Sequence, residues 1–131
     1  IIIVKTKPKF FKLTDVLDYM NNQSFMYDDF SDRLMISSKK KTGNIKGSIR
    51  ILNLTLDIGS DNKVVNIEMR KAGDYLKSLG LSPKILDNLT DAEVIFKQCR
   101  DGYLISFILK SGKIIERVPY NIQFQKMPVI Q

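Results

Sequence analysis

The stretches LNLTLDI (52–58) and VNIEMR (65–70) decide the fold of this chain. In both of them apolar side chains alternate with polar ones, which is typical of β-strands with one buried face. The intervening GSDN (59–62) contains residues that tolerate the backbone conformations of tight turns. The sequence therefore predicts an antiparallel hairpin whose leucines and isoleucines face a core.

Working outward toward the start of the chain, the segment 33–38 predicts another strand. Residues 39–48 contain four lysines and two glycines and are predicted to form a loop. Nearer the start, Thr14 is expected to cap a short helix. The apolar residues of that helix are Val16, Leu17 and Met20.

After the hairpin, the sequence predicts one main helix. The apolar residues Ala72, Tyr75, Leu76 and Leu79 fall at helical spacing, and Gly80 stands where a helix would end. Ser82 and Pro83 then resemble an N-cap followed by proline in the first helical turn, and predict a short turn through Leu89.

A second β unit follows at 93–98, 103–110 and 113–118, with glycine-containing turns between the runs. Thr90 to Glu93 matches a helix capping box, but the β-branched pair that follows favours a strand. The sequence therefore predicts a single α+β domain over 1–131. Its antiparallel β-sheet consists of the hairpin and a three-stranded meander, with one main helix and short flanking helices.

The middle run of the meander is apolar on both faces, which indicates a strand covered on both sides. One face carries Tyr103, Ile105, Phe107 and Leu109. The other carries Leu104 and Ile108 beside Ser106. We expect the helix around Tyr75 to cover the inner face. A second copy of the chain is then the expected cover of the other, so Leu104 and Ile108 are predicted to lie at or near a homodimer interface.

The chain is basic, with a formal net charge of +7 over 131 residues. Lysines neutralise phosphates and aromatic rings stack on bases, so lysines interleaved with Phe10 and Phe11 are typical of nucleic-acid surfaces. The alternative interpretation is a solvated loop and an edge strand protected by lysines. The candidate nucleic-acid contacts are Lys5, Lys7, Lys9, Lys39, Lys40, Lys41 and Lys46.

Residue types that usually carry catalysis are scarce. The chain has no histidine and one cysteine, which excludes Ser-His and Cys-His nucleophile pairs and His-ligated zinc. Asp57 and Glu68 lie on partner strands as a weak carboxylate pair, and Cys99 beside Arg100 is a weak nucleophile candidate. We therefore predict that the protein is not an enzyme and has no cofactor.

An acidic cluster at Asp28, Asp29 and Asp32 does not fit a cation-binding loop, because Phe30 occupies a ligand position. We interpret it as a solvated turn with capping aspartates, and predict no metal site. A single cysteine and the absence of a long apolar run favour a cytoplasmic protein without membrane partners. The lysine-rich composition, with alanine only at positions 72 and 92, is compatible with a thermophilic archaeal source.

The central part of the chain resembles a known family. Its pattern is Tyr27-Asp28 with Asp32, Leu34 and Ile36, then Leu56-Asp57, Asp61, Lys63-Val64-Val65, Ile67-Glu68 and Ala72. Over residues 27 to about 79 this pattern is similar to the small prokaryotic family known only as domain of unknown function 2283. Asn66 and Gly73 depart from the family pattern. The resemblance implies a compact β-rich domain followed by a helix, and implies no catalytic residues.

Two functional hypotheses follow from these observations. The first is a non-catalytic, self-associating interaction module, whose partners are a second copy and a protein encoded nearby. The alternative is a nucleic-acid-binding protein that uses its basic loops.

Overall fold

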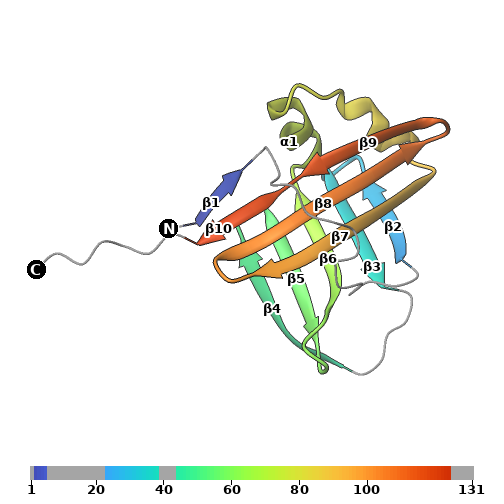
Figure 1. Cartoon of the computed structure of the whole chain (residues 1–131). Coiled ribbons are helices and arrows are strands. Elements are labelled where there is room, and N and C mark those ends of the chain that lie inside the picture. The colour runs from blue at the N-terminus through green and yellow to red at the C-terminus, as the bar shows by residue number, and fades with distance from the viewer. Residues whose placement is uncertain (1, 6–22, 39–43, 125–131) are drawn as a thin grey trace, which may run out of the picture.

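The computed structural model describes residues 2–5, 23–38 and 44–124 and is built mainly from antiparallel β-sheets (Figure 1). Two five-stranded sheets pack face to face. The hairpin sheet has the strand order β2-β3-β6-β5-β4, and the meander sheet has the order β1-β10-β8-β7 with β9 also paired to β8. The strands are β1 (Ile2–Lys5), β2 (Gln23–Asp28), β3 (Arg33–Ser38), β4 (Ile45–Ile51), β5 (Leu54–Gly59), β6 (Val64–Arg70), β7 (Asp91–Cys99), β8 (Gly102–Ser111), β9 (Ile114–Pro119) and β10 (Asn121–Phe124).

The predicted central hairpin is present, as β5 and β6 pair antiparallel across the turn at 59–62. Its start was predicted wrongly. Leu52 lies in the turn before β5, with a φ of 54°, and is 55% exposed. The predicted loop over 39–48 is also wrong in its last part, because β4 begins at Ile45 and pairs with β5. The alternation of apolar and polar residues continues back to Leu52 by chance, but Leu52 belongs to the turn that reverses the chain between β4 and β5.

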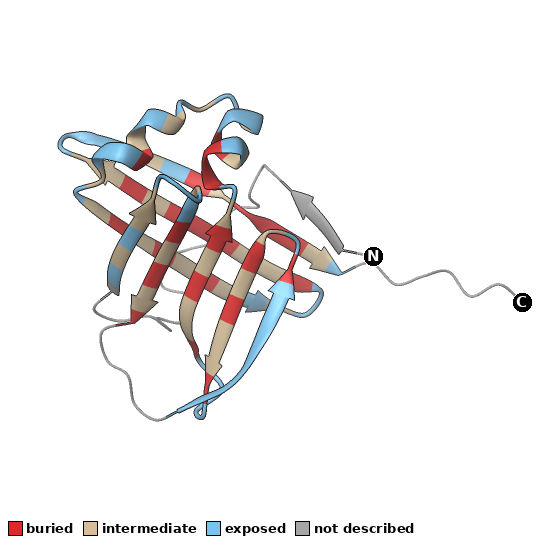
Figure 2. Cartoon of the chain, turned by 180° about the vertical axis from the view of Figure 1, so that it is seen from behind, coloured by how far each residue is buried: buried red, intermediate tan, exposed pale blue. Residues whose placement is uncertain are grey.

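The core lies between the two sheets, and the buried stripes of both sheets face it (Figure 2). Leu56 and Ile67 of the hairpin sheet are 1% exposed, as is Phe107 of the meander sheet. The expectation that the main helix covers the inner face of the meander is therefore wrong. The hairpin sheet covers it, because two half-apolar sheets bury more surface against each other than a short helix can bury.

Two short helices close one end of the sandwich (Figure 1). They are α1 (Ala72–Ser78) and the 3₁₀ helix η2 (Pro83–Asn88). Gly80, with a φ of 76°, follows α1 in the left-handed conformation that glycine favours. The hydroxyl of Ser82 accepts a hydrogen bond from the N–H of Lys84 and caps η2. The predicted helix near Thr14 lies outside the described residues.

The pairing of the last two strands with β8 is interrupted at Tyr120, which lies between the end of β9 and the start of β10. The N–H of Tyr120 still donates to the carbonyl of Ile105 at 2.8 Å. The N–H of Ile105 instead donates to the Asn121 side-chain oxygen at 3.2 Å. The Asn121 amide thus replaces one rung of the ladder, and both strands pair with β8 on either side of the break.

Close backbone packing fixes the start of β8. A Cβ atom on Gly102 would lie 1.9 Å from the carbonyl oxygen of Ile122. Only glycine fits at that distance, so β10 can lie against the β7–β8 turn. In the described part of the chain, no helix is long and apolar enough to cross a membrane.

Candidate interaction surface

The outer face of the meander sheet carries the residues predicted to lie at an interface. Pairing with β7 and β9 places Leu104 and Ile108 on the face that points away from the hairpin sheet. Both side chains are half-buried. Ser106 between them is 1% exposed, and its hydroxyl has no hydrogen-bond partner among the described residues. The centre of this face is therefore closed to solvent, and its open apolar surface lies at the margin.

That margin is the start of β9, where two adjacent isoleucines are open to solvent. Ile114 is 59% exposed and Ile115 is 63% exposed. Ile115 pairs with Lys110 and shares the outer face with Ile108. Because successive side chains of a strand point to opposite faces, Ile114 lies on the other face, toward the helices. The β8–β9 hairpin end is thus apolar on both faces.

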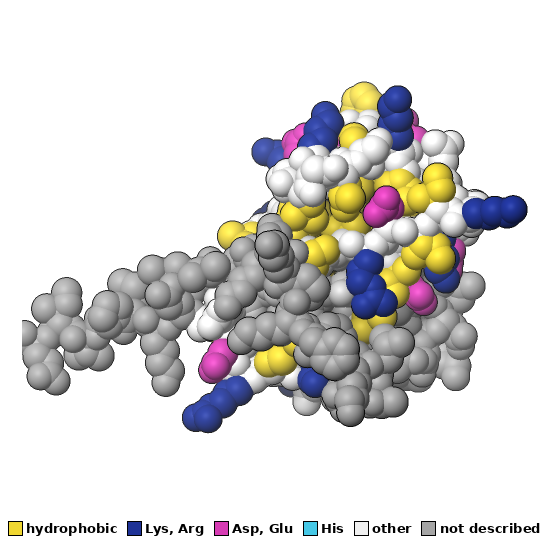
Figure 3. Space-filling view, turned by 45° about the horizontal axis from the view of Figure 1, so that its top comes forward, with side chains coloured by type: hydrophobic (Ala, Val, Ile, Leu, Met, Phe, Trp, Pro, Cys, Tyr) yellow, Lys and Arg dark blue, Asp and Glu magenta, His cyan; other side chains and the backbone are white. Residues whose placement is uncertain are grey.

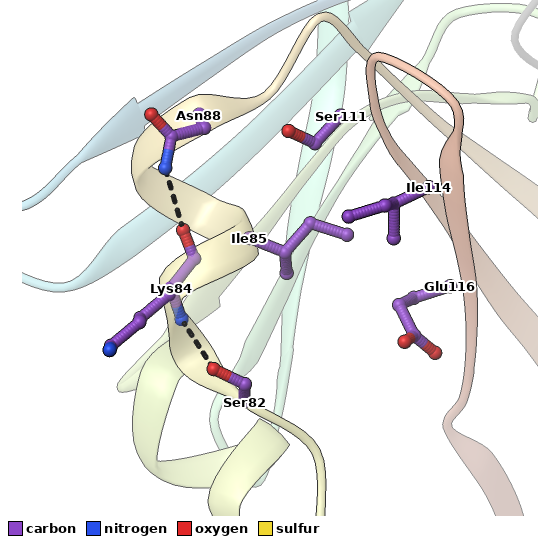
Figure 4. A pocket seen from close by; sticks show the side chains of 7 residues that line it. All are labelled: Ser82, Lys84, Ile85, Asn88, Ser111, Ile114 and Glu116. Atoms are coloured by element: carbon purple, nitrogen blue, oxygen red, sulfur yellow. Dashed lines mark hydrogen bonds between the residues drawn. The ribbon is translucent and has the colours of Figure 1, made fainter.

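A hollow of about 260 Å³ separates β9 from η2 on the side of Ile114 (Figure 4). Ile85 and Ile114 point toward each other across it, and the Lys84 side chain points away. Sites for small organic ligands usually enclose roughly 300–1,000 Å³. The hollow is smaller than that and partly apolar, so it suits one or two aliphatic side chains better than a cofactor. Its lining residues are Ser82, Lys84, Ile85, Asn88, Ser111, Ile114 and Glu116.

The space-filling view toward this end of the molecule shows the same character (Figure 3). Hydrophobic side chains gather in a band across it, which an acidic side chain interrupts, and both basic and acidic side chains lie around the band. An apolar patch with a charged rim is typical of protein–protein contacts.

The predicted nucleic-acid contacts are described only in part. Lys7, Lys9, Lys39, Lys40 and Lys41 lie outside the described residues. The backbone of Lys5 ends β1, where it pairs with Asn121. Lys46 lies on β4, and its ammonium group donates a 2.8 Å hydrogen bond to the Asn62 side chain.

The two weak catalytic candidates on the hairpin are engaged elsewhere. Asp57 accepts hydrogen bonds from Ser48 at 2.6 Å and from Asn66 at 3.0 Å. Glu68 forms an ion pair with Arg33 at 3.3 Å. The two residues are not opposite each other across the strands, since Asp57 pairs with Asn66 and Glu68 pairs with Thr55. They therefore do not act as a pair. Cys99 ends β7 half-buried.

The aspartates of the acidic turn at 28–32 accept hydrogen bonds within the turn and from the start of α1. Asp28 accepts hydrogen bonds from the N–H of Phe30 at 3.0 Å and from the Ser31 hydroxyl at 2.7 Å. The Ser31 bond is the main cause of the lowered pKa of Asp28. Asp32 accepts from the N–H of Gly73 at 2.8 Å, at the start of α1. No group of three or more metal-ligating side chains occurs among the described residues.

Tyrosines tie these elements together. The Tyr27 hydroxyl donates to Asp32 at 2.7 Å, and burial and this hydrogen bond raise the pKa of Tyr27. Tyr75 donates to the carbonyl of Pro119, and Tyr120 donates to the side chain of Asn53. Burial raises the pKa of Tyr75 and of Tyr120, whose rings lie 4.8 Å apart. These hydroxyls hold their protons as structural donors.

The sequence analysis did not single out the two isoleucines of β9 as candidate contact residues. A pattern that could have found them is present: in a strand with one covered face, two adjacent apolar residues cannot both point into the core. No family model, no curated protein and no solved structure matches the chain.

Proposed function

We propose that this protein is a non-catalytic interaction module that associates with a second copy of itself through the end of the β8–β9 hairpin. The observation that carries the proposal is the exposure of Ile114 and Ile115, at 59% and 63%, on opposite faces of one strand. Monomers rarely expose large contiguous apolar patches, and Ile115 extends the apolar outer face that carries Ile108.

Three further features support self-association. Ile115 continues the outer face that carries Ile108, so one contact would bury both residues. The hollow beside Ile114 is large enough to receive an aliphatic side chain from the other copy. A two-fold dimer uses the same surface twice, so a hairpin end with an isoleucine protruding on one face and a hollow on the other can pair with itself.

The test is the molar mass of the chain in solution. We expect light scattering at tens of micromolar to give twice the monomer mass of 15.1 kDa. Ile115→Lys should shift the mass to that of the monomer, because it places a charge in an apolar contact. The matched control is Met26→Lys, since Met26 is 57% exposed on the outer face of the hairpin sheet.

Two results would contradict the proposal. One is a parent protein that stays monomeric, and the other is a dimer that survives Ile115→Lys.

The alternative function, nucleic-acid binding, rests on the net charge of +7. Retention on a DNA column that falls steeply with salt would support it. We also propose that residues 27–79 are related to domain of unknown function 2283. A cytoplasmic location and a protein partner encoded nearby are proposed as well.

A further inference from the structure

The free edge of the hairpin sheet is a second surface, remote in sequence from β9. Within the described residues, β4 pairs with β5 alone and ends the strand order. Six of its seven residues are exposed, and Figure 2 shows it as a continuous exposed strand at the edge. An edge strand presents unpaired N–H and C=O groups to any extended chain that lies beside it.

The space beside this edge is open. Over the sheet face at Gly47, a Cβ atom would meet no atom within 4 Å, so an added strand would meet no side chain above this position. Ile49 shares the inner face with its partner Leu56 and is 41% exposed. Ser48 and Lys46 make hydrogen bonds to Asp57 and Asn62, so the ends of these side chains lie toward β5 and the following turn. They therefore leave the backbone edge accessible.

The charge of this edge is basic. Lys46 and Arg50 are both exposed, and neither forms an ion pair with a carboxylate of the described residues. Asp57, the nearest acidic residue in the register, is held by Ser48 and Asn66. An incoming strand that places carboxylates beside Arg50 would therefore gain attraction without displacing an existing ion pair.

We infer that β4 binds an extended acidic segment of a partner protein, which adds to the hairpin sheet as a sixth strand. Main-chain hydrogen bonds to β4 provide affinity. Alternating apolar side chains of the segment extend the inner face beyond Ile49, and one of its carboxylates pairs with Arg50. A second copy of this chain fits less well, because antiparallel pairing of β4 with itself brings basic residues together.

Nucleic acid also fits this edge less well. Stacking on bases requires exposed aromatic rings beside the basic groups. In the described part of the chain, the exposed aromatic side chains are Phe30 and Phe124, and neither belongs to β4 or its neighbour β5.

The experiment uses a fluorescein-labelled nine-residue peptide in which valine and glutamate alternate. We expect saturable binding to the full chain by fluorescence anisotropy, weaker at higher salt. Arg50→Glu should weaken the affinity about tenfold, because the carboxylates then face a like charge. Lys77→Glu is the matched control, since Lys77 is exposed on α1. A peptide of alternating valine and lysine should not bind.

Backbone N-methylation separates strand addition from simple charge attraction. Two peptides carry methyl groups on the odd or the even amides, and only the one methylated on the side facing β4 should lose binding. Equal binding of both peptides, or unchanged binding to Arg50→Glu, would overturn the inference. So would duplex DNA that displaces the peptide with higher affinity, or a dimer mass that Arg50→Glu abolishes.

Discussion

The outer faces of the two sheets differ in chemistry although their inner faces share one core. On the hairpin sheet, the outer face is polar over β4, β5 and β6, where side chains bond to one another, as Asp57 does with Ser48 and Asn66. On the meander sheet, the outer face has Leu104 and Ile108 around a buried Ser106. A face of the first kind is solvated, whereas the centre of the second face is shielded from solvent.

This difference shows what alternation can and cannot tell. Strict alternation in β5 and β6 corresponds to one covered face, and the outer face of those strands is solvated. Apolar residues on both faces of β8 correspond to two covers. The sequence does not say which element supplies the second cover, because that depends on packing between distant segments.

The largest expected effect tests whether the two sheets share one core. Phe107→Ala in β8 should lower the free energy of unfolding by about 3–5 kcal/mol, and Leu56→Ala in β5 by about 2–5 kcal/mol. Both side chains are 1% exposed. Urea unfolding followed by circular dichroism should show a single transition for both variants. Two transitions, with only one of them moved by each variant, would show separate cores.

A smaller effect compares the two outer faces directly. Ile108 and Met35 are half-buried apolar residues on the outer faces of the meander sheet and the hairpin sheet. Ile108→Lys should destabilise the protein by about 1–3 kcal/mol, because it charges a covered face. Met35→Lys should change stability by less than about 0.5 kcal/mol, since Glu68 lies opposite it. Equal losses of melting temperature in the two variants would show that the two outer faces are covered to the same extent.

The smallest effect concerns alkaline pH. Burial raises the pKa of Tyr75 and Tyr120, so the folded state keeps protons that the unfolded state releases above about pH 10. Their contribution to stability is complete below that pH and is lost as the pH rises further. The melting temperature should therefore fall more steeply above pH 10 in the parent than in Tyr75→Phe. Parallel curves would show that burial of the Tyr75 hydroxyl does not matter.

Strands with a regular apolar pattern were predictable, and those without one were not. β3 was expected at 33–38 and is observed at Arg33–Ser38. β4 was missed because Lys46, Gly47 and Ser48 resemble a loop, and an exposed edge strand needs no apolar alternation. β10 was missed because it consists of four residues separated from β9 only by the irregular Tyr120.

The candidate surface was predictable to the level of the strand but not of the residue. The sequence singled out β8, and Leu104 and Ile108 do lie on its outer face. How far each side chain is covered depends on neighbours that sequence does not reveal, as the 1% exposure of Ser106 shows. The open residues, Ile114 and Ile115, belong to the next strand.

The pairing of β1 with β10 has a consequence for synthesis. Lys5 lies opposite Asn121, so β1 finds its partner only after the strands from β2 to β9 have been synthesised. On the ribosome, the hairpin sheet from β2 to β6 can form early, because its partners are close in sequence. β1 leaves the exit tunnel before the hairpin sheet and has no β10 to pair with until that strand has followed.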